Sequence, residues 1–403
     1  MNRLSTINPR LATFLFFVFY IILAPQLYAL DPHKRITQYD IKVYTAKDGL
    51  PMNSLKKVFQ DSRGYIWIGT QEGLVRFDGV EFMLYDKSKH PGLKSNFILD
   101  IAEDANGNLW LATGGGGISR FDGFKFTTYD TTDGLAHNFV NKIIVGKDGI
   151  IWAGTQNGLS RFRNGQFINY TIDDGLCGNN IQALFEDSDG NLFIGNSGSG
   201  LNMITNGSII EINLPYNISS LCEKRSGEIV LGVEAGIILT FRKGMLYNLD
   251  PNAPFPEFRN FSYIRDIIED RHGNLWCGSV QNGIFRYSHG RVDRLAVENG
   301  LPTHNSHFLS LLEDNEGSLW FAGDAGLIQL KDNKFISYGK LEGSPSSFGH
   351  TVCEDQSGNI CVGFRESGLT IFSQYSVKNF GNICKRPGIG IAAIIPAHDG
   401  GLW

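Results

Sequence analysis

A phrase that recurs about every 42 residues constrains this chain more than any other feature of its 403-residue sequence. The phrase is clearest at residues 61–70 (DSRGYIWIGT), where an Asp-x-x-Gly tetrad precedes a strand-like run around Trp67. Steps of 37 to 46 residues separate the centres of its copies, which are Trp67, Trp110, Trp152, Phe193, Val230, Trp276, Trp320, Cys361 and Trp403. Because this phase is kept along the whole chain, the sequence predicts an array of similar structural units.

Each copy has the pattern of four antiparallel strands joined by short turns. The Asp-x-x-Gly tetrad is typical of a type I turn, with Asp first and Gly fourth. Two-residue Asp-Gly or Asn-Gly hairpins, in which both residues need positive φ, are predicted at 78–79, 122–123, 164–165 and 206–207. The 48 Gly residues and the aromatic content of 12% fit many tight turns between packed strands. These turns exclude helical repeats of similar length, so the predicted fold class is all-β, a β-propeller of four-stranded blades with about 42 residues each.

The repeat leaves the number of blades open. A seven-bladed ring would span residues 40–345 and leave residues 346–403 as a further blade and the truncated start of the next; this is the arrangement we predict. An eight-bladed ring would instead reach about residue 385. Trp403 stands in the middle of a repeat, so we expect the natural protein to continue beyond it.

The N-terminus has the pattern of an export signal. Arg3 and Arg10 precede an apolar run at residues 11–24, which as a helix would rise only about 21 Å and fall short of the hydrocarbon core. We predict a signal peptide at residues 1–29, with an uncleaved membrane anchor as the alternative. In either case the rest of the chain is expected to be exported.

Turn lengths distinguish the two rims of the predicted propeller. Connections after the second and fourth strands of each blade are the longer and more varied ones, and such loops often carry binding residues. We therefore predict a ligand-binding rim that contains Gln71, Glu72, Gly115, Gln156, Asn157, Asn196, Gln281, Asn282, Asp324, Arg365 and Glu366. If Glu72, Asp324 and Glu366 converged near the axis, the chain could instead be an exported lyase or glycoside hydrolase, because such enzymes need positioned acid–base groups.

An Asn and an Arg each recur at a fixed position of the repeat, and we predict that both have structural roles. The side-chain amides of Asn53, Asn96, Asn138 and Asn179 are predicted to cap the loops that enter the first strand of each blade. A sialidase-like carboxylate clamp would use arginines from several blades. Regular recurrence favours instead a role inside each blade, next to acidic neighbours, for Arg76, Arg120, Arg161 and Arg286.

Nothing in the sequence has the spacing of a metal or cofactor site, and none is predicted. Residues 187–190 (DSDG) resemble the start of a calcium loop without its later ligands, so a turn is predicted there. His304 and His307 are interpreted as ordinary loop residues. Cys277 and Cys361, two of the six Cys, are predicted to be small buried apolar residues, and their pairing stays open. A net charge of −5 gives no electrostatic basis for nucleic-acid binding.

The ordered motif set resembles the two-component regulator propeller repeat. It runs from Asp-Gly-Leu-Pro at residues 48–51 through the Asp-x-x-Gly and Trp-x-Gly-Thr phrases to the Arg-Phe-Asp-Gly hairpin at 76–79, and the resemblance covers residues 40–403. It implies the periplasmic ligand-sensing module of a receptor whose output domain, a histidine kinase or a diguanylate cyclase, lies outside this chain. It further implies a small-molecule or glycan ligand and a homodimer in the full-length receptor. Contact with the membrane would come only through a C-terminal region outside this chain or an uncleaved N-terminal segment.

Overall fold

The computed structural model describes residues 30–32, 34–198, 200–233, 237–249, 263–280, 283–297, 301–302, 307–333, 338–339, 342–345, 348–365, 367–373, 376–381, 391–397 and 401–403. The predicted signal peptide lies outside the described residues, as do Gln281, Asn282, His304 and Glu366. In the part of the chain that is described, no helix combines the length and the apolar character needed to cross a membrane.

Eight antiparallel sheets of four strands each account for the described strands, as the repeat predicts. Blades 1 to 4 are β2–β5 (Leu55–Gln60, Ile66–Thr70, Leu74–Phe77, Phe82–Tyr85), β6–β9 (Ile98–Glu103, Leu109–Thr113, Gly117–Phe121, Phe126–Tyr129), β10–β13 (Val140–Val145, Ile151–Thr155, Gly158–Arg163, Gln166–Tyr170) and β14–β17 (Ile181–Glu186, Leu192–Asn196, Leu201–Thr205, Ser208–Ile212). Blades 5 to 7 are β18–β21 (Ile218–Glu223, Ile229–Val233, Ile238–Arg242, Met245–Asn248), β22–β25 (Ile264–Glu269, Leu275–Ser279, Ile284–Ser288, Arg291–Leu295) and β26–β28 (Phe308–Glu313, Leu319–Gly323, Gly326–Lys331) with β1 (Asp40–Tyr44). The eighth sheet is β29–β32 (Gly349–Glu354, Ile360–Phe364, Gly368–Ser373, Ser376–Asn379).

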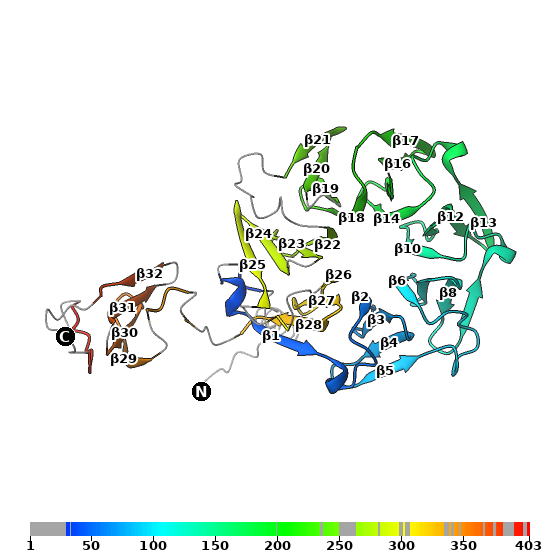
Figure 1. Cartoon of the computed structure of the whole chain (residues 1–403). Helices are drawn as coiled ribbons and strands as arrows, with labels where there is room; N and C mark the ends of the chain where they lie inside the picture. Colours follow the sequence, from blue (N-terminus) through cyan, green and yellow to red (C-terminus); the bar gives the residue numbers. More distant parts are fainter. Residues whose placement is uncertain are drawn as a thin grey trace, which may run out of the picture.

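Seven of these sheets form a closed ring with the first strand of each blade innermost (Figure 1). The inner strands contact one another in the order β2, β6, β10, β14, β18, β22, β26 and back to β2. The N-terminal strand β1 completes blade 7 by pairing with β28, from Asp40 opposite Lys331 to Tyr44 opposite Leu327. The two ends of the ring are therefore joined by a full ladder of backbone hydrogen bonds. The eighth sheet lies outside the ring.

Side chains also join each blade to the next, and the same contacts recur across the closure. The last residue of an inner strand is often Glu, whose carboxylate accepts backbone N–H groups from the turn of the preceding blade. Glu103 accepts Ser62 N at 2.7 Å, and at the closure Gln60 Oε1 of blade 1 accepts Asn315 N of blade 7 at 2.7 Å. Blade 7 thus contacts blade 1 as an ordinary neighbour would.

The Asp-x-x-Gly tetrads form the predicted turns and have a second role that the sequence did not reveal. Gly64 N donates to Asp61 O at 2.9 Å, which closes the turn. The Asp61 carboxylate also accepts the indole N–H of Trp67 at 2.9 Å, so it fixes the largest core side chain of its blade. The same bond recurs in three further blades, as Asp104–Trp110, Asp270–Trp276 and Asp314–Trp320. The tetrad at 187–190 is likewise a turn, with Gly190 N donating to Asp187 O at 3.1 Å.

The hairpin prediction was right for the Asn-Gly pairs and wrong for the Asp-Gly pairs. Asn164 and Asn206 have φ of 51° and 49° and form two-residue turns. At residues 78–81 and 122–125, however, the loop contains four residues and the aspartates do not have positive φ. The physical reason is the carboxylate: Asp78 Oδ1 accepts Val80 N at 2.9 Å and Glu81 N at 2.8 Å, which stabilises the wider turn.

The connections between blades contain short 3₁₀ turns, η2 (Ala46–Asp48), η3 (Thr131–Asp133) and η4 (Ile172–Asp174); a further one, η1 (Ile36–Gln38), precedes β1. Each inter-blade turn ends at a Gly in the left-handed region, such as Gly49 with φ of 94°. The predicted Asn caps are confirmed: the side-chain oxygens of Asn53, Asn138 and Asn179 each accept the first N–H of the turn at 2.9 Å, and Asn96 accepts Lys87 N at 2.8 Å.

Candidate functional site

The predicted rim residues do not form one surface. Gln71, Glu72, Gly115, Gln156 and Asn157 lie exposed in the turns between the second and third strands of blades 1 to 3. Asn196 was wrongly placed on the rim surface: its side chain is fully buried and donates to Asn202 Oδ1 at 3.1 Å. Arg365 was also wrongly placed: it follows β30 in the eighth sheet, which lies outside the ring, so it does not share the rim of the ring with the other predicted residues.

The rim carboxylate of Asp324 is the predicted residue with the most developed surroundings. Asp324 belongs to the β27–β28 turn of blade 7, and it accepts Ser54 Oγ of the entry to blade 1 at 2.8 Å. Its other oxygen lies 3.0 Å from His307 Nδ1. Ser54 and His307 therefore bind the same carboxylate from two sides. The serine is not placed on the imidazole, as a nucleophile activated by that base would have to be.

The recurring arginines lie within their own blades, as predicted. Arg76, Arg120, Arg161 and Arg286 are each paired in register with the central Trp of their blade. Arg286 forms an ion pair with its acidic neighbour Asp293, and Arg76 and Arg120 lie near enough to Asp78 and Asp122 to interact with them electrostatically. Arg286 Nη1 also donates to Tyr39 OH at 2.6 Å and Nη2 to Lys34 O at 2.7 Å, which fastens the segment before β1 to blade 6.

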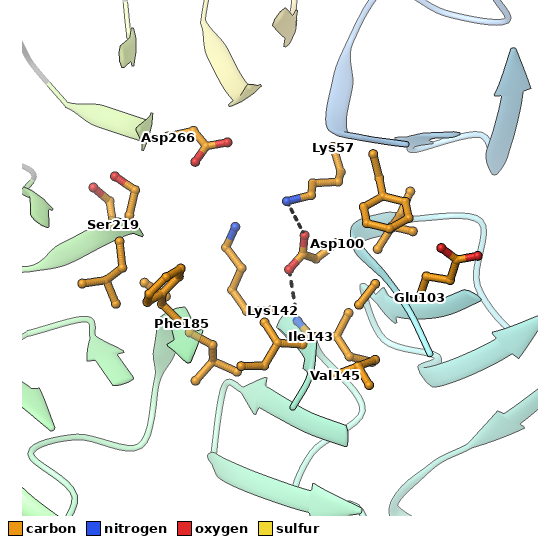
Figure 2. A pocket seen from close by; sticks show the side chains of 17 residues that line it. Lys57, Asp100, Glu103, Lys142, Ile143, Val145, Phe185, Ser219 and Asp266 are labelled. Atoms are coloured by element: carbon orange, nitrogen blue, oxygen red, sulfur yellow. Dashed lines mark hydrogen bonds and ion pairs between the residues drawn. The ribbon is translucent and has the colours of Figure 1, made fainter. Parts of the chain in front are cut away.

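A pocket along the axis of the ring holds charged side chains that the rim prediction missed. The third residue of each inner strand, here called the axial position, follows a β-bulge in every blade. In ring order the axial residues are Lys57, Asp100, Lys142, Ala183, Ser220, Asp266 and Ser310. All but Ser310 line a pocket of about 460 Å³, and Figure 2 shows four charged side chains entering it from different blades.

One side of the pocket is an ion pair. Lys57 Nζ lies 3.0 Å from Asp100 Oδ1, and Asp100 Oδ2 accepts Ile143 N of the next blade at 3.1 Å (Figure 2). Burial alone would raise the pKa of Asp100, but the ammonium groups of Lys57 and Lys142 and the Ile143 N–H outweigh it and lower that pKa. Burial alone would lower the pKa of Lys57, and the Asp100 and Asp266 carboxylates raise it instead. Both groups are therefore charged at neutral pH.

The other side of the pocket has charges without partners. Among the described residues, neither Lys142 nor Asp266 has an ion-pair partner. Asp266 is held in place by backbone donors, Leu311 N at 2.8 Å and Ile267 N at 3.0 Å. Between them around the ring stands Ser220, which is 5% exposed and whose Oγ has no hydrogen-bond partner.

A signal for this pocket was present in the sequence. Each axial residue stands ten positions before the centre of its repeat, as Lys57 does before Trp67. Six of the seven residues at that phase are polar, and four of these carry a charge. The rim prediction overlooked this signal because it assumed that the inner strands were only core.

The chemistry available at this site is electrostatic recognition. No group of three or more His, Cys, Asp or Glu side chains that could hold a metal ion occurs among the described residues.

Cys277 and Cys361 are buried, as predicted, and burial raises the pKa of the Cys277 thiol to about 12. The described cysteines are free, with Cys353 opposite Cys361 across β29 and β30.

With the ring and its axial pocket described, comparison with known proteins identifies the repeat. The sequence profile of the family described as two component regulator propeller matches residues 92–115 and 175–198, which are parts of blades 2 and 4 with their entry loops. In these two segments the chain matches the two-component regulator propeller repeat. The resemblance seen in the sequence is thereby confirmed, together with the propeller fold.

One histidine kinase matches this chain locally in sequence, and solved structures of similar fold come from a receptor and from an enzyme. Histidine kinase P4 of Formosa agariphila is 37% identical over 68 residues, which cover 17% of this chain and 5% of that protein. The extracellular domain assigned to the hybrid two-component system BT3049 of B. thetaiotaomicron has a TM-score of 0.74 at 21% identity, over 91% of this chain and 52% of that one. Virginiamycin B lyase of Staphylococcus aureus has a TM-score of 0.56 at 17% identity, over 72% and 98%. The chain thus spans about half of the receptor domain it resembles, and at these identities the solved structures establish the fold.

Proposed function

We propose that this chain is the extracellular ligand-sensing part of a two-component receptor. The observation that carries the proposal is the match to two-component regulator propeller repeats within a ring built like the extracellular domain of a hybrid two-component system. The local similarity to a histidine kinase supports a kinase as the output domain of the full receptor. In this proposal the ring is periplasmic and its ligand is a small molecule or a glycan.

The axial pocket supports a sensing role because it is a preformed, polar site built from six blades at once. A ligand there would contact the inner strands of several blades, and these strands contact one another around the ring. A ligand changes the equilibrium between two signalling states of a receptor only if it binds one state more tightly than the other. Pocket contacts drawn from several blades can provide such a difference if the blades move against each other.

A second candidate, an exported lyase, is favoured by the paired groups on the rim. His307 and Asp324, with Nδ1 3.0 Å from Oδ2, are the kind of imidazole and carboxylate that general acid–base catalysis uses. The propeller fold shared with virginiamycin B lyase makes this candidate concrete. Under this alternative the ligand would be consumed instead of sensed.

Two measurements separate these functions. The purified chain is titrated with a panel of oligosaccharides and small polar metabolites by isothermal titration calorimetry, and each binder is incubated with it and analysed by mass spectrometry. For a sensor we expect binding with no change in the ligand, and a several-fold change in autophosphorylation when that ligand is added to membranes that contain the full receptor. Cleavage of the ligand that is lost in Asp324→Asn would refute the sensor proposal in favour of the lyase.

A further inference from the structure

The free space in the axial pocket lies between an unpaired ammonium group and an unpaired carboxylate. Going around the ring from Lys142 in blade 3 to Asp266 in blade 6, the two axial residues in between are Ala183 and Ser220. These side chains are small, so they leave room where larger ones would meet. Figure 2 shows Lys142 and Asp266 reaching into this space while Lys57 and Asp100 contact each other across the opposite side.

The two charges in this space each lack a directly bound partner of opposite charge in the described part of the chain. Neither Lys142 nor Asp266 has an opposite charge within ion-pair distance among the described residues; they act on Asp100 and Lys57 only at longer range. Each therefore loses hydration in the part-buried pocket without a direct counter-ion. Lys142 offers three N–H donors, and the carboxylate of Asp266 has lone pairs left beside its two backbone donors. The Ser220 side chain lies between the two charges around the ring and is small, but its hydroxyl packs against Gly232 of β19 and is not open to a ligand.

We propose that the axial pocket binds a small zwitterion, with its carboxylate on Lys142 and its ammonium group on Asp266. An amino acid or a short peptide has this chemistry. The pocket of about 460 Å³ lies within the range of small-ligand sites. The backbone N–H groups of Leu311 and Ile267 hold the Asp266 carboxylate in position, so little ordering is needed when a cation arrives.

A series of small ligands tests whether binding needs both charges and which separation between them fits the pocket. Glycine, β-alanine, γ-aminobutyrate and 6-aminohexanoate carry the same two charges at increasing separation, and butyrate and butylamine each carry one of them. These probes are titrated into the full chain by calorimetry. We expect at least one member of the series to bind in a 1:1 ratio, and its singly charged analogues to bind at least tenfold more weakly, because each charge-assisted contact is lost with its partner left buried.

Variants test each end separately. Lys142→Met keeps the length of the side chain and removes its charge. Asp266→Asn keeps an oxygen that can accept Leu311 N. Each should weaken binding at least tenfold, while Lys125→Met, on the exposed β8–β9 hairpin, should leave it unchanged. All variants are first compared by thermal unfolding, so that a folding defect is recognised.

The outcomes are distinct. If no member of the series binds to normally folded protein, or if butyrate binds as tightly as the amino acids and Asp266→Asn has no effect, the inference is overturned. The inference rests on the proposed function only for the signalling role of the ligand. If a zwitterion binds and autophosphorylation does not respond, sensing is refuted and the pocket assignment stands. If the receptor responds to another ligand and no zwitterion binds, the pocket assignment is refuted and sensing stands.

Discussion

Replacing Asp270 with Ala tests whether the Asp-x-x-Gly carboxylate stabilises the blade through its core Trp. Asp270 is 3% exposed, and its oxygens accept Trp276 Nε1 at 2.7 Å, Asn274 Nδ2 at 2.8 Å and the backbone N–H groups of His272 and Asn274 at 2.9 Å. Trp276 and Asn274 are themselves 0% and 1% exposed, so no water replaces the lost oxygens. A buried donor left without an acceptor costs roughly 1–3 kcal/mol, and two such side-chain donors give a loss of about 4 kcal/mol.

Blade 3 contains a matched control, because Gly146 stands where the tetrads of blades 1, 2, 4, 6 and 7 begin with Asp. Its nearby Asp148 is exposed and accepts Ile150 N at 3.0 Å, so Asp148→Ala should cost about 1 kcal/mol or less. Both variants are compared with the parent chain by urea unfolding, with Trp fluorescence as the signal. A loss of under about 1 kcal/mol for Asp270→Ala, equal to the control, would show that the carboxylate serves the turn alone and would refute this reasoning.

Three further outcomes follow from the structure. Asn164→Val should destabilise the chain by roughly 1–2 kcal/mol, since φ is 51° there and a β-branched residue is strained at such an angle; equal urea midpoints for the variant and the parent would contradict it. Arg286→Met should release the segment before β1, detected as faster proteolysis within residues 30–44; an unchanged cleavage rate would show that β1 pairing alone holds the segment. The bond from Lys94 Nζ, followed by those from Thr132, lowers the pKa of Asp130 to about 2 from 3.8, so this pair favours the folded state above about pH 4 and its effect is lost as the pH falls through about 2. In a carboxyl NMR titration Lys94→Met should raise that pKa, and an unshifted titration would exclude the pair.

Local rules explain why so much of the ring could be predicted from the sequence. The type I tetrads, the Asn-Gly turns and the Asn caps depend on residues within a few positions of each other, and these predictions were confirmed. The Asp-Gly hairpins failed for a reason that is also local. A carboxylate that accepts two backbone N–H groups competes with the two-residue turn, and this alternative was not considered at 78–79 and 122–123.

The candidate site was predicted poorly because it depends on contacts between residues far apart in the sequence. Lys57 and Asp100 are neighbours only because successive blades pack side by side, and Asp266 faces them only because the ring closes. Asn196 reads as a loop residue, yet β15 extends to include it and buries its side chain. The rim prediction relied on loop length, which gives no information on where the axial side chains meet.

The sequence by itself determined the blade, its strands, its turns and its period, because each blade repeats the same local hydrogen bonds and the same alternation of buried side chains. It could not decide how many blades close, because seven or eight copies have nearly the same local structure. The tertiary structure decided this through one pairing: β1 occupies the outer edge of blade 7, so the ring ends there and the eighth sheet is left outside. The same closure placed Lys142 and Asp266 on one pocket, and the site exists only once the ring is complete.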